Sequence, residues 1–306
     1  MKFASYVRDG TAAVGVVTDA GLVALTDLRA DAPSDMRSVL AWLDRDRPDL
    51  RPEGSGTAIP LAEVEFLPVV PDPHAIWCAA LTYLSHVREG GDRPVPDHPL
   101  FFLRVAASQV GHGRPLLVPG VSAELDYEGE LAVVIGRAGR HIPVSDALRH
   151  VAGYACYNDG SVRDWQRHTT QITMGKNFGS TGGFGPWLVT PEEFGDPYRH
   201  RLTTRLNGEV MQSASIGELL FSIEYLIHYV STASRLEVGD VIVTGTCGGV
   251  GLRRRPPVFM RPGDVVEVEI DGLGTLRNPV ALETGGDGFT YRPPLAVAAG
   301  GQGGRS

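Results

Sequence analysis

Hydrophobic and polar positions alternate in short runs along most of this chain, a pattern that predicts more strands than helices. The run 131–135 is apolar, partly β-branched and bounded by Gly136, so we expect a strand covered on both faces rather than a helix. Glu128 and Glu130 lie at its start. Because successive side chains of a strand point to opposite faces, both glutamates should lie on the same face. Two carboxylates on one face of a buried strand are costly unless they gain a partner.

Similar runs predict the remaining elements. Short strands are expected within 1–28 and over 64–70, 75–81, 101–105, 151–157 and 241–243, with hairpins joining 202–206 to 210–212 and 265–270 to 274–277. Apolar residues at helical spacing predict helices over 36–43, capped by Ser34 or Asp35, and over 83–89, 144–150, 161–168 and 218–230. The glycine-rich stretch 175–187 is expected to be a loop.

These elements indicate two domains and a tail. A chain of 306 residues can bury a full core, and one large domain with a smaller companion is the natural expectation. We place a small N-terminal domain at residues 1–70, where the charged, Pro- and Gly-rich stretch 45–60 is typical of a linker or loop. The larger domain covers 71–292. The tail 293–306 is rich in Pro, Ala and Gly without periodicity, so we expect it to be disordered.

Composition and charge exclude several classes of protein. The formal charge of -8 and the pI of about 5.6 argue against a nucleic-acid surface. No apolar run approaches the length of a membrane span, and charged residues interrupt the N-terminus where a signal peptide would need an apolar stretch. The three cysteines are widely spaced and odd in number, which favours a reducing cytoplasm over a disulfide framework. Neither G-x-S-x-G nor H-E-x-x-H occurs, so a serine hydrolase or a zincin has no support.

A bound divalent cation would compensate the paired glutamates. All-oxygen ligands suit hard ions such as Mg2+, Ca2+ or Mn2+. Asp159 follows the predicted strand 151–157 and is our candidate for a third oxygen ligand, because a strand end holds a side chain rigidly beside a pocket. Two alternatives remain open: both glutamates could lie in water at a strand end, and Asp159 could be a turn residue before Gly160.

Two further candidates for chemistry lie outside this strand. His86 and Glu89 are three residues apart on a predicted helix and can share a face, so the carboxylate could orient the imidazole as a general base. The alternative is an exposed pair that does no chemistry. Lys176, within the glycine-rich stretch, could supply positive charge to an anionic ligand, or be an ordinary surface lysine.

Five segments, in order, resemble those of the fumarylacetoacetate hydrolase superfamily. They are Y-L-S-H-V-R-E (83–89), D-Y-E-G-E-L (126–131), N-D-G-S-V-R-D (158–164), G-K-N-F (175–178) and T-G-T (244–246). The resemblance extends from about Pro71 to Thr284. The stretch 175–190 is similar to the subgroup described as 2-hydroxyhepta-2,4-diene-1,7-dioate isomerase-like.

The resemblance implies an α+β, β-rich fold: a catalytic domain built on a mixed β-roll or flattened barrel, preceded by a small N-terminal β domain, in a homodimer. It implies that Mg2+ or Mn2+, with Ca2+ as a substitute, is held by three carboxylates. The resemblance assigns Glu128, Glu130 and Asp159 as metal ligands, His86 and Glu89 as the pair that activates water, and Lys176 and Thr246 as substrate contacts. We take Lys176 as a further catalytic group, and we expect Tyr83, Arg104, Arg163 and Gln166, with Thr246, to bind the substrate.

The expected activity is divalent-metal-dependent hydrolysis of a C–C bond in a diketo acid or acylpyruvate-like substrate. The metal would stabilise an enolate, and the His86–Glu89 dyad would activate water. The alternative is decarboxylation, keto–enol isomerisation or hydration of a 2-oxo acid at the same site. Thr82, Arg104-Val105 and Cys247 depart from the residues usual in the family, so the substrate stays open. A non-catalytic scaffold is a third hypothesis, which the full set of candidate ligands speaks against.

Overall fold

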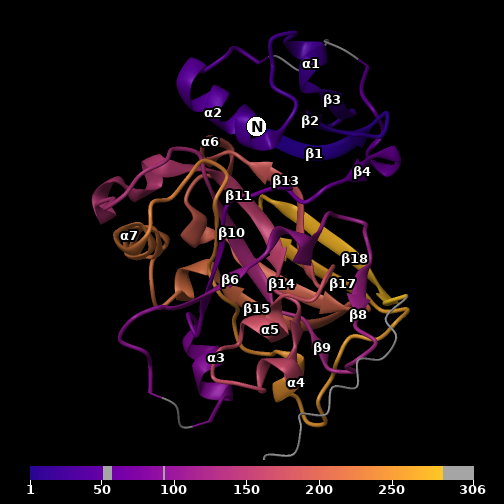
Figure 1. Cartoon of the computed structure of the whole chain (residues 1–306), viewed down its shortest axis with the longest axis vertical. Coiled ribbons are helices and arrows are strands. Elements are labelled where there is room, and N and C mark those ends of the chain that lie inside the picture. The colour runs from indigo at the N-terminus through magenta and orange to yellow at the C-terminus, as the bar shows by residue number, and fades with distance from the viewer. Residues whose placement is uncertain (51–56, 92–93, 285–306) are drawn as a thin grey trace, which may run out of the picture.

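The computed structural model describes residues 1–50, 57–91 and 94–284 (Figure 1). The tail predicted over 293–306 therefore lies outside the described residues. The expected α+β, strand-rich architecture is confirmed, with mixed sheets and short helices. No helix among the described residues has the length and apolar character that crossing a bilayer requires.

The largest sheet of the described chain has a central path of nine strands. In spatial order these are β3 (Gly21–Ala24), β2 (Thr11–Thr18), β1 (Lys2–Arg8), β13 (Gly182–Val189), β11 (Val151–Asn158), β10 (Gly129–Ile135), β16 (Val241–Val243), β5 (Ile76–Ala80) and β6 (Leu100–Arg104), with β4 (Glu65–Phe66) on β1 and β7 (Gln109–Val110) on β13. The pairing of β16 with β5 is parallel, whereas β10 pairs antiparallel with both its neighbours.

A second sheet packs against this one. Its order is β15 (Glu209–Ser215), β14 (Arg201–Leu206), β17 (Val265–Ile270), β18 (Gly274–Leu282) and β8 (Leu116–Val118), and a small ladder joins β9 (Leu125–Asp126) to β12 (Ser161–Val162). Both hairpins predicted from the sequence are therefore confirmed.

Strand β10 is buried on both faces, as its apolar run predicts. Leu131 and Val133 belong to the core cluster that contains side chains of the second sheet, and Ala132 and Val134 to the cluster that contains side chains of α2. No residue of β10 is exposed. This double burial holds the strand that carries Glu130 in one position.

The helices are short. They are α1 (Leu25–Leu28), α2 (Met36–Asp46), α3 (Leu84–Glu89), α4 (Arg163–Gln166), α5 (Thr173–Lys176), α6 (Pro191–Phe194) and α7 (Ile223–Ala233). The predicted cap of α2 is Asp35, whose side chain accepts a hydrogen bond from Ser38 N at 2.9 Å. Helix α7 begins later than its apolar spacing predicts, because Ser222 caps it and the preceding residues form a 3-10 turn.

The glycine-rich stretch is the clearest departure from the sequence prediction. Residues 182–187, expected in a loop, belong to the buried strand β13, between β11 and β1. Here glycine allows close packing rather than a turn: a Cβ on Gly183 would lie 2.6 Å from Asn278 Oδ1, and one on Gly182 would lie 2.5 Å from Gln109 Oε1. Those neighbours come from distant parts of the chain, so local sequence does not reveal them.

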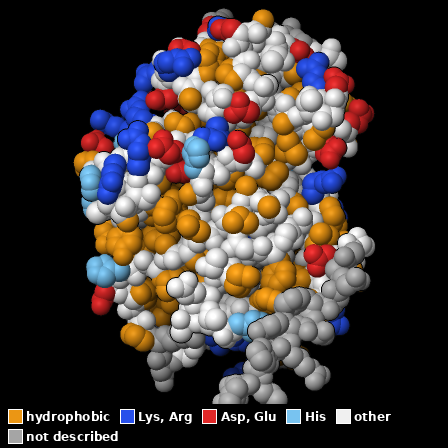
Figure 2. All heavy atoms as spheres, viewed as in Figure 1, with side chains coloured by type: hydrophobic (Ala, Val, Ile, Leu, Met, Phe, Trp, Pro, Cys, Tyr) orange, Lys and Arg blue, Asp and Glu red, His pale blue; other side chains and the backbone are white. Residues whose placement is uncertain are grey.

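The N-terminal strands extend the large sheet through β1, which pairs with β13 at Phe3 and Leu188. The division at residue 70 stays a prediction. The N-terminal elements lie at the top of the view in Figure 1. Charged side chains gather over the upper part of this face, whereas its lower part carries mainly apolar and uncharged side chains (Figure 2).

We expect Leu226→Ala in α7 to lower the free energy of unfolding by about 2–5 kcal/mol, because it removes a fully buried side chain from the main core. Denaturant unfolding measures the change. Thr232→Ala, at an exposed position of the same helix, is the control and should change stability by less than about 0.5 kcal/mol. Equal effects of the two substitutions would contradict the assignment of this helix face to the core.

Candidate active site

Three carboxylates from two distant parts of the sequence meet at one end of the large sheet. Suitable oxygen atoms of Glu128, Glu130 and Asp159 all lie within 4.8 Å of one another, and all three residues are buried. Strands β10 and β11 are antiparallel, and Gly129 pairs with Asn158. This register brings the residue after β11 beside the start of β10. We call these residues the acidic trio.

Backbone contacts fix the trio. Asp159 N donates to Glu128 O at 2.8 Å, and Asn158 Oδ1 accepts from Glu128 N at 2.9 Å. Gly160 follows Asp159 and packs tightly, since a Cβ there would lie 1.9 Å from Thr181 O. Only glycine fits this position without moving the backbone that carries Asp159.

Three buried cations surround two members of the trio. Lys176 Nζ lies 2.6 Å from both Glu128 Oε2 and Asp159 Oδ2. Arg163 Nη2 donates to Glu128 Oε1 at 2.6 Å, and Arg104 Nη1 to Asp159 Oδ1 at 2.5 Å. Although burial opposes the ionised form of Glu128, Arg163 and Lys176 hold its pKa below the ordinary value.

Glu130 is different, because no cationic side chain among the described residues pairs with it. Gly245 N donates to its Oε2 at 2.5 Å. Burial, together with the charges of Asp159 and Glu128, raises the pKa of Glu130 well above its ordinary value. An uncompensated carboxyl group in an all-oxygen cluster is the environment that a hard divalent cation would stabilise, so the donor set fits such an ion.

The ion pairs do not prevent coordination. Each carboxylate oxygen has two lone pairs, so it can accept an N–H and still face a cation. If all are ionised, Glu128, Glu130, Asp159 and the neighbouring Asp126 carry four negative charges against three positive charges on Arg104, Arg163 and Lys176. A divalent cation would reverse the net sign and suit the site to an anionic ligand.

Asp126 is a site residue that the sequence analysis did not select. Its Oδ2 accepts from Arg163 Nε at 2.8 Å and Leu252 N at 2.9 Å, and its Oδ1 from Gly251 N at 2.8 Å. It therefore orients Arg163 and anchors the turn around residue 251. Asp126 lies two residues before Glu128, the same interval as that between Glu128 and Glu130. This repeated interval could have identified it as a candidate site residue from the sequence.

His86 and Glu89 form the predicted pair on α3. His86 Nδ1 lies 2.6 Å from Glu89 Oε1, and Glu89 Oε2 accepts from Gly249 N at 2.7 Å. The carboxylate is thus fixed from both sides. Because Nδ1 faces Glu89, Nε2 is the ring nitrogen left for other partners.

A cavity of about 400 Å3 connects the dyad to the trio. Its lining includes these predicted residues: His86, Glu128, Glu130, Asp159, Arg163, Gln166, Lys176 and Thr246. Thr246 is held from two sides, donating to Gly129 O at 2.9 Å and accepting from Gln212 Nε2 at 2.8 Å. The remaining predicted residues do not line it: Glu89 contacts His86, Tyr83 packs in the main core, and Arg104 pairs with Asp159.

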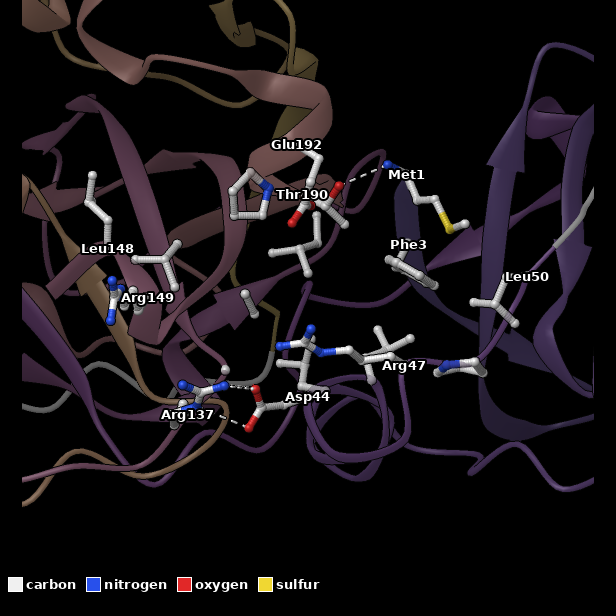
Figure 3. A pocket seen from close by; sticks show the side chains of 18 residues that line it. Met1, Phe3, Asp44, Arg47, Leu50, Arg137, Leu148, Arg149, Thr190 and Glu192 are labelled. Atoms are coloured by element: carbon white, nitrogen blue, oxygen red, sulfur yellow. Dashed lines mark hydrogen bonds and ion pairs between the residues drawn. The ribbon is translucent and has the colours of Figure 1, made fainter. Parts of the chain in front are cut away.

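A second and larger cavity, of about 640 Å3, lies between the N-terminal strands with α2 and the ends of β11 and β13 (Figure 3). It contains none of the predicted site residues. Its charged lining consists of Asp44, Glu192, Arg47, Arg137 and Arg149. Arg137 is engaged with Asp44 at 2.6 Å. The smaller cavity, not the larger one, contains the buried carboxylates and is therefore the candidate active site.

Comparison with known proteins agrees with this geometry. Residues 75–281 match the Fumarylacetoacetate (FAA) hydrolase C-terminal family. The mitochondrial oxaloacetate tautomerase FAHD2A of Bos taurus is 40% identical over 261 residues, 83% of each chain. A fumarylacetoacetate hydrolase structure from Exiguobacterium antarcticum aligns with a TM-score of 0.83 and 32% identity, covering 92% of this chain and 100% of that one. The structure of a 2-hydroxyhepta-2,4-diene-1,7-dioate isomerase from Mycobacterium marinum aligns with a TM-score of 0.74 and 27% identity, over 93% of this chain and 100% of that one. This chain therefore belongs to the fumarylacetoacetate hydrolase family of enzymes.

Proposed function

We propose that this enzyme moves a proton within a 2-oxo acid and interconverts its keto and enol forms with the help of a divalent cation. The observation that carries the proposal is that the acidic trio and His86, which Glu89 contacts from outside the lining, face one cavity. The similarity to an oxaloacetate tautomerase over most of both chains supports this choice among the activities considered. Keto–enol isomerisation is one of the three reactions given above as alternatives to hydrolysis, beside decarboxylation and hydration.

Glu128, Glu130 and Asp159 would hold Mg2+ or Mn2+, and Ca2+ could substitute for either, because the donors are all carboxylate oxygens. When bound, the cation supplies positive charge beside a carbonyl oxygen, where negative charge develops as a neighbouring C–H bond ionises.

The side chains of this protein would do the rest. Lys176 Nζ can donate three hydrogen bonds and spends two on the trio, so one remains for a substrate oxygen. Gln166 Oε1 accepts from Arg163 Nη1 at 2.9 Å. This contact occupies the amide oxygen, so the amide NH2 group of Gln166 is a further donor in the cavity wall. These groups would orient the carboxylate of a 2-oxo acid.

His86 would carry the proton. Its Nε2 faces away from Glu89, and the ring lines the cavity. Glu89 would fix the ring and stabilise its charged form, and a positioned base of this kind is worth about 10^2 to 10^4 in rate.

Hydrolysis of a C–C bond is the second candidate. The same dyad could remove a proton from water instead of from carbon, and a structure with a high TM-score to this chain is a fumarylacetoacetate hydrolase. The water would add to the carbonyl carbon, and the C–C bond electrons would leave with the 2-oxo acid fragment, which regains a proton.

We also propose that the protein forms a homodimer through β6. This strand is an edge of the large sheet. Leu100 and Leu103 on it, Val105 directly after it and Met174 in the adjacent α5 are between 43% and 59% exposed. Unpaired edges with apolar side chains favour pairing with a second copy. A cytoplasmic location stays a prediction from the composition.

We expect Glu130→Gln to weaken Mn2+ binding by at least about tenfold, because it removes the charge that lacks a protein cation. Without metal, this variant should melt no lower than the wild type, since burial disfavours that charge. Asp159→Asn is the matched variant. It should lower the free energy of unfolding by about 3–5 kcal/mol, because it leaves Arg104 and Lys176 short of a buried partner.

Calorimetric titration with Mn2+ and thermal unfolding of the metal-free variants measure both effects. If Glu130→Gln bound Mn2+ as tightly as the wild type, the acidic trio would not be the metal site.

His86→Ala should reduce turnover by about 10^2 to 10^4 while Mn2+ affinity changes little, because the imidazole moves a proton and is outside the acidic trio. Glu89→Gln should give a smaller loss in turnover, since it keeps the side chain but weakens its hold on the ring. Steady-state kinetics and Mn2+ titration provide the two readouts. Unchanged turnover in His86→Ala would refute its role as the base.

Oxaloacetate and one 3-acylpyruvate, assayed in parallel with Mn2+, separate the candidate reactions. We expect the enol absorbance of oxaloacetate to fall faster with the enzyme than without it, and no CO2 to be released, because proton transfer leaves every C–C bond intact. Cleavage of the acylpyruvate into two acids would favour hydrolysis instead, and CO2 from oxaloacetate would favour decarboxylation. Keto–enol conversion is followed by the enol absorbance, and cleavage or decarboxylation is identified from the acids and CO2 that form.

A further inference from the structure

The cavity of the acidic trio has a buried floor and an exposed rim of opposite charge. Glu128, Glu130 and Asp159 are at most 4% exposed. Arg167 and Arg253 line the same cavity but lie at the surface. Neither arginine belongs to the residues assigned above to metal, proton transfer or substrate.

Arg253 is held on a rigid turn with its guanidinium group unused. It ends the 3-10 helix Gly251–Arg253, whose first two backbone amides donate to buried Asp126. The neighbouring Arg254 has structural contacts, with Nη2 donating to Met211 O at 2.7 Å. In the described part of the chain, the Arg253 guanidinium has no hydrogen-bond or ion-pair partner. A fixed backbone with a free cation at a cavity mouth is suited to binding an anion.

Arg167 adds a second charge on the same rim. It directly follows Gln166 and α4, and its Nη2 donates to Glu124 Oε2 at 2.8 Å. A guanidinium group has five N–H donors, so this contact leaves others for a ligand. Glu124 offsets part of its charge, which makes Arg253 the stronger of the two anion-binding groups.

Most of the remaining lining of this cavity is apolar. Leu100, Phe102, Ile172, Val250 and Leu252 contribute to it. A ligand whose 2-oxo acid end lies on the floor would therefore pass a stretch suited to carbon before reaching the rim. The volume of about 400 Å3 leaves room for a molecule longer than a three-carbon acid.

We propose that Arg253, assisted by Arg167, is a specificity-determining residue that binds a second carboxylate at the far end of the substrate. The preferred substrates are then 2-oxo acids with an acidic group at both ends. This inference rests on the proposed function, because it takes the 2-oxo acid end to lie at the acidic trio.

Two acids with the same five-carbon chain test the proposal. 2-Oxoglutarate has the second carboxylate and 2-oxopentanoate has a methyl group in its place. With the Mn2+-loaded enzyme, we expect 2-oxoglutarate to bind more tightly in calorimetric titration. Arg253→Gln should weaken its binding by about tenfold and change the binding of 2-oxopentanoate by less than about twofold, because only the former has a charge for the rim.

Arg255→Gln is the matched control, since Arg255 lies two residues away, is exposed and does not line the cavity. It should change neither affinity. Arg253→Lys keeps the charge but not the planar fork, and should recover part of the lost affinity. Because the Arg253 guanidinium has no hydrogen-bond or ion-pair partner among the described residues, its variants should melt like the wild type.

The failures are distinguishable. The wild type could bind both acids equally in a Mn2+-dependent manner, or Arg253→Gln could weaken the binding of both to the same extent. In either case Arg253 does not bind the second carboxylate, and the proposed function still stands. If neither acid shows Mn2+-dependent binding to the wild type, the proposed function and this inference both fall.

Discussion

The structure depends on the balance of buried charge around the acidic trio. Carboxylates placed by β9, β10 and β11 lie beneath the protein surface, where they are stable only with partners. Arg104 from β6, Arg163 from α4 and Lys176 from α5 supply them. These ion pairs join segments that are far apart in the sequence, so the charge balance also holds the walls of the cavity together.

Glu130 is where this balance is incomplete. Burial, with the charges of Asp159 and Glu128, raises the pKa of Glu130, and no cationic side chain of the described chain pairs with it. The other three carboxylates, Asp126, Glu128 and Asp159, share the three cations Arg104, Arg163 and Lys176, so the excess negative charge is that of Glu130. A site prepared in this way favours a small divalent cation over a bulky organic one, because only the former can approach several buried oxygens at once.

The site is rigid because of the sheets that carry it. Strand β10 is packed on both faces, and its register with β11 sets the distance between Glu130 and Asp159. The proposed base, His86, comes in contrast from the short helix α3, and its partner Glu89 accepts a hydrogen bond from Gly249 N. Relatives with different named activities share this fold. A rigid cation site with a base on a separate element would explain how one fold supports different activities. Small changes in the base or the rim would then redirect the same chemistry.

Much of this protein could be read from its sequence. The apolar run after Glu130 determines a doubly covered strand, the interval between Glu128 and Glu130 determines their common face, and the spacing of His86 and Glu89 determines their contact. All of these are short-range relations set by strand or helix periodicity. Only the tertiary structure decided that Lys176 is buried between Glu128 and Asp159, that Asp126 anchors Arg163, and that residues 182–187 form a strand. These features depend on segments that meet only after folding. Backbone periodicity encodes which way a side chain points, but packing between distant segments decides what it meets there.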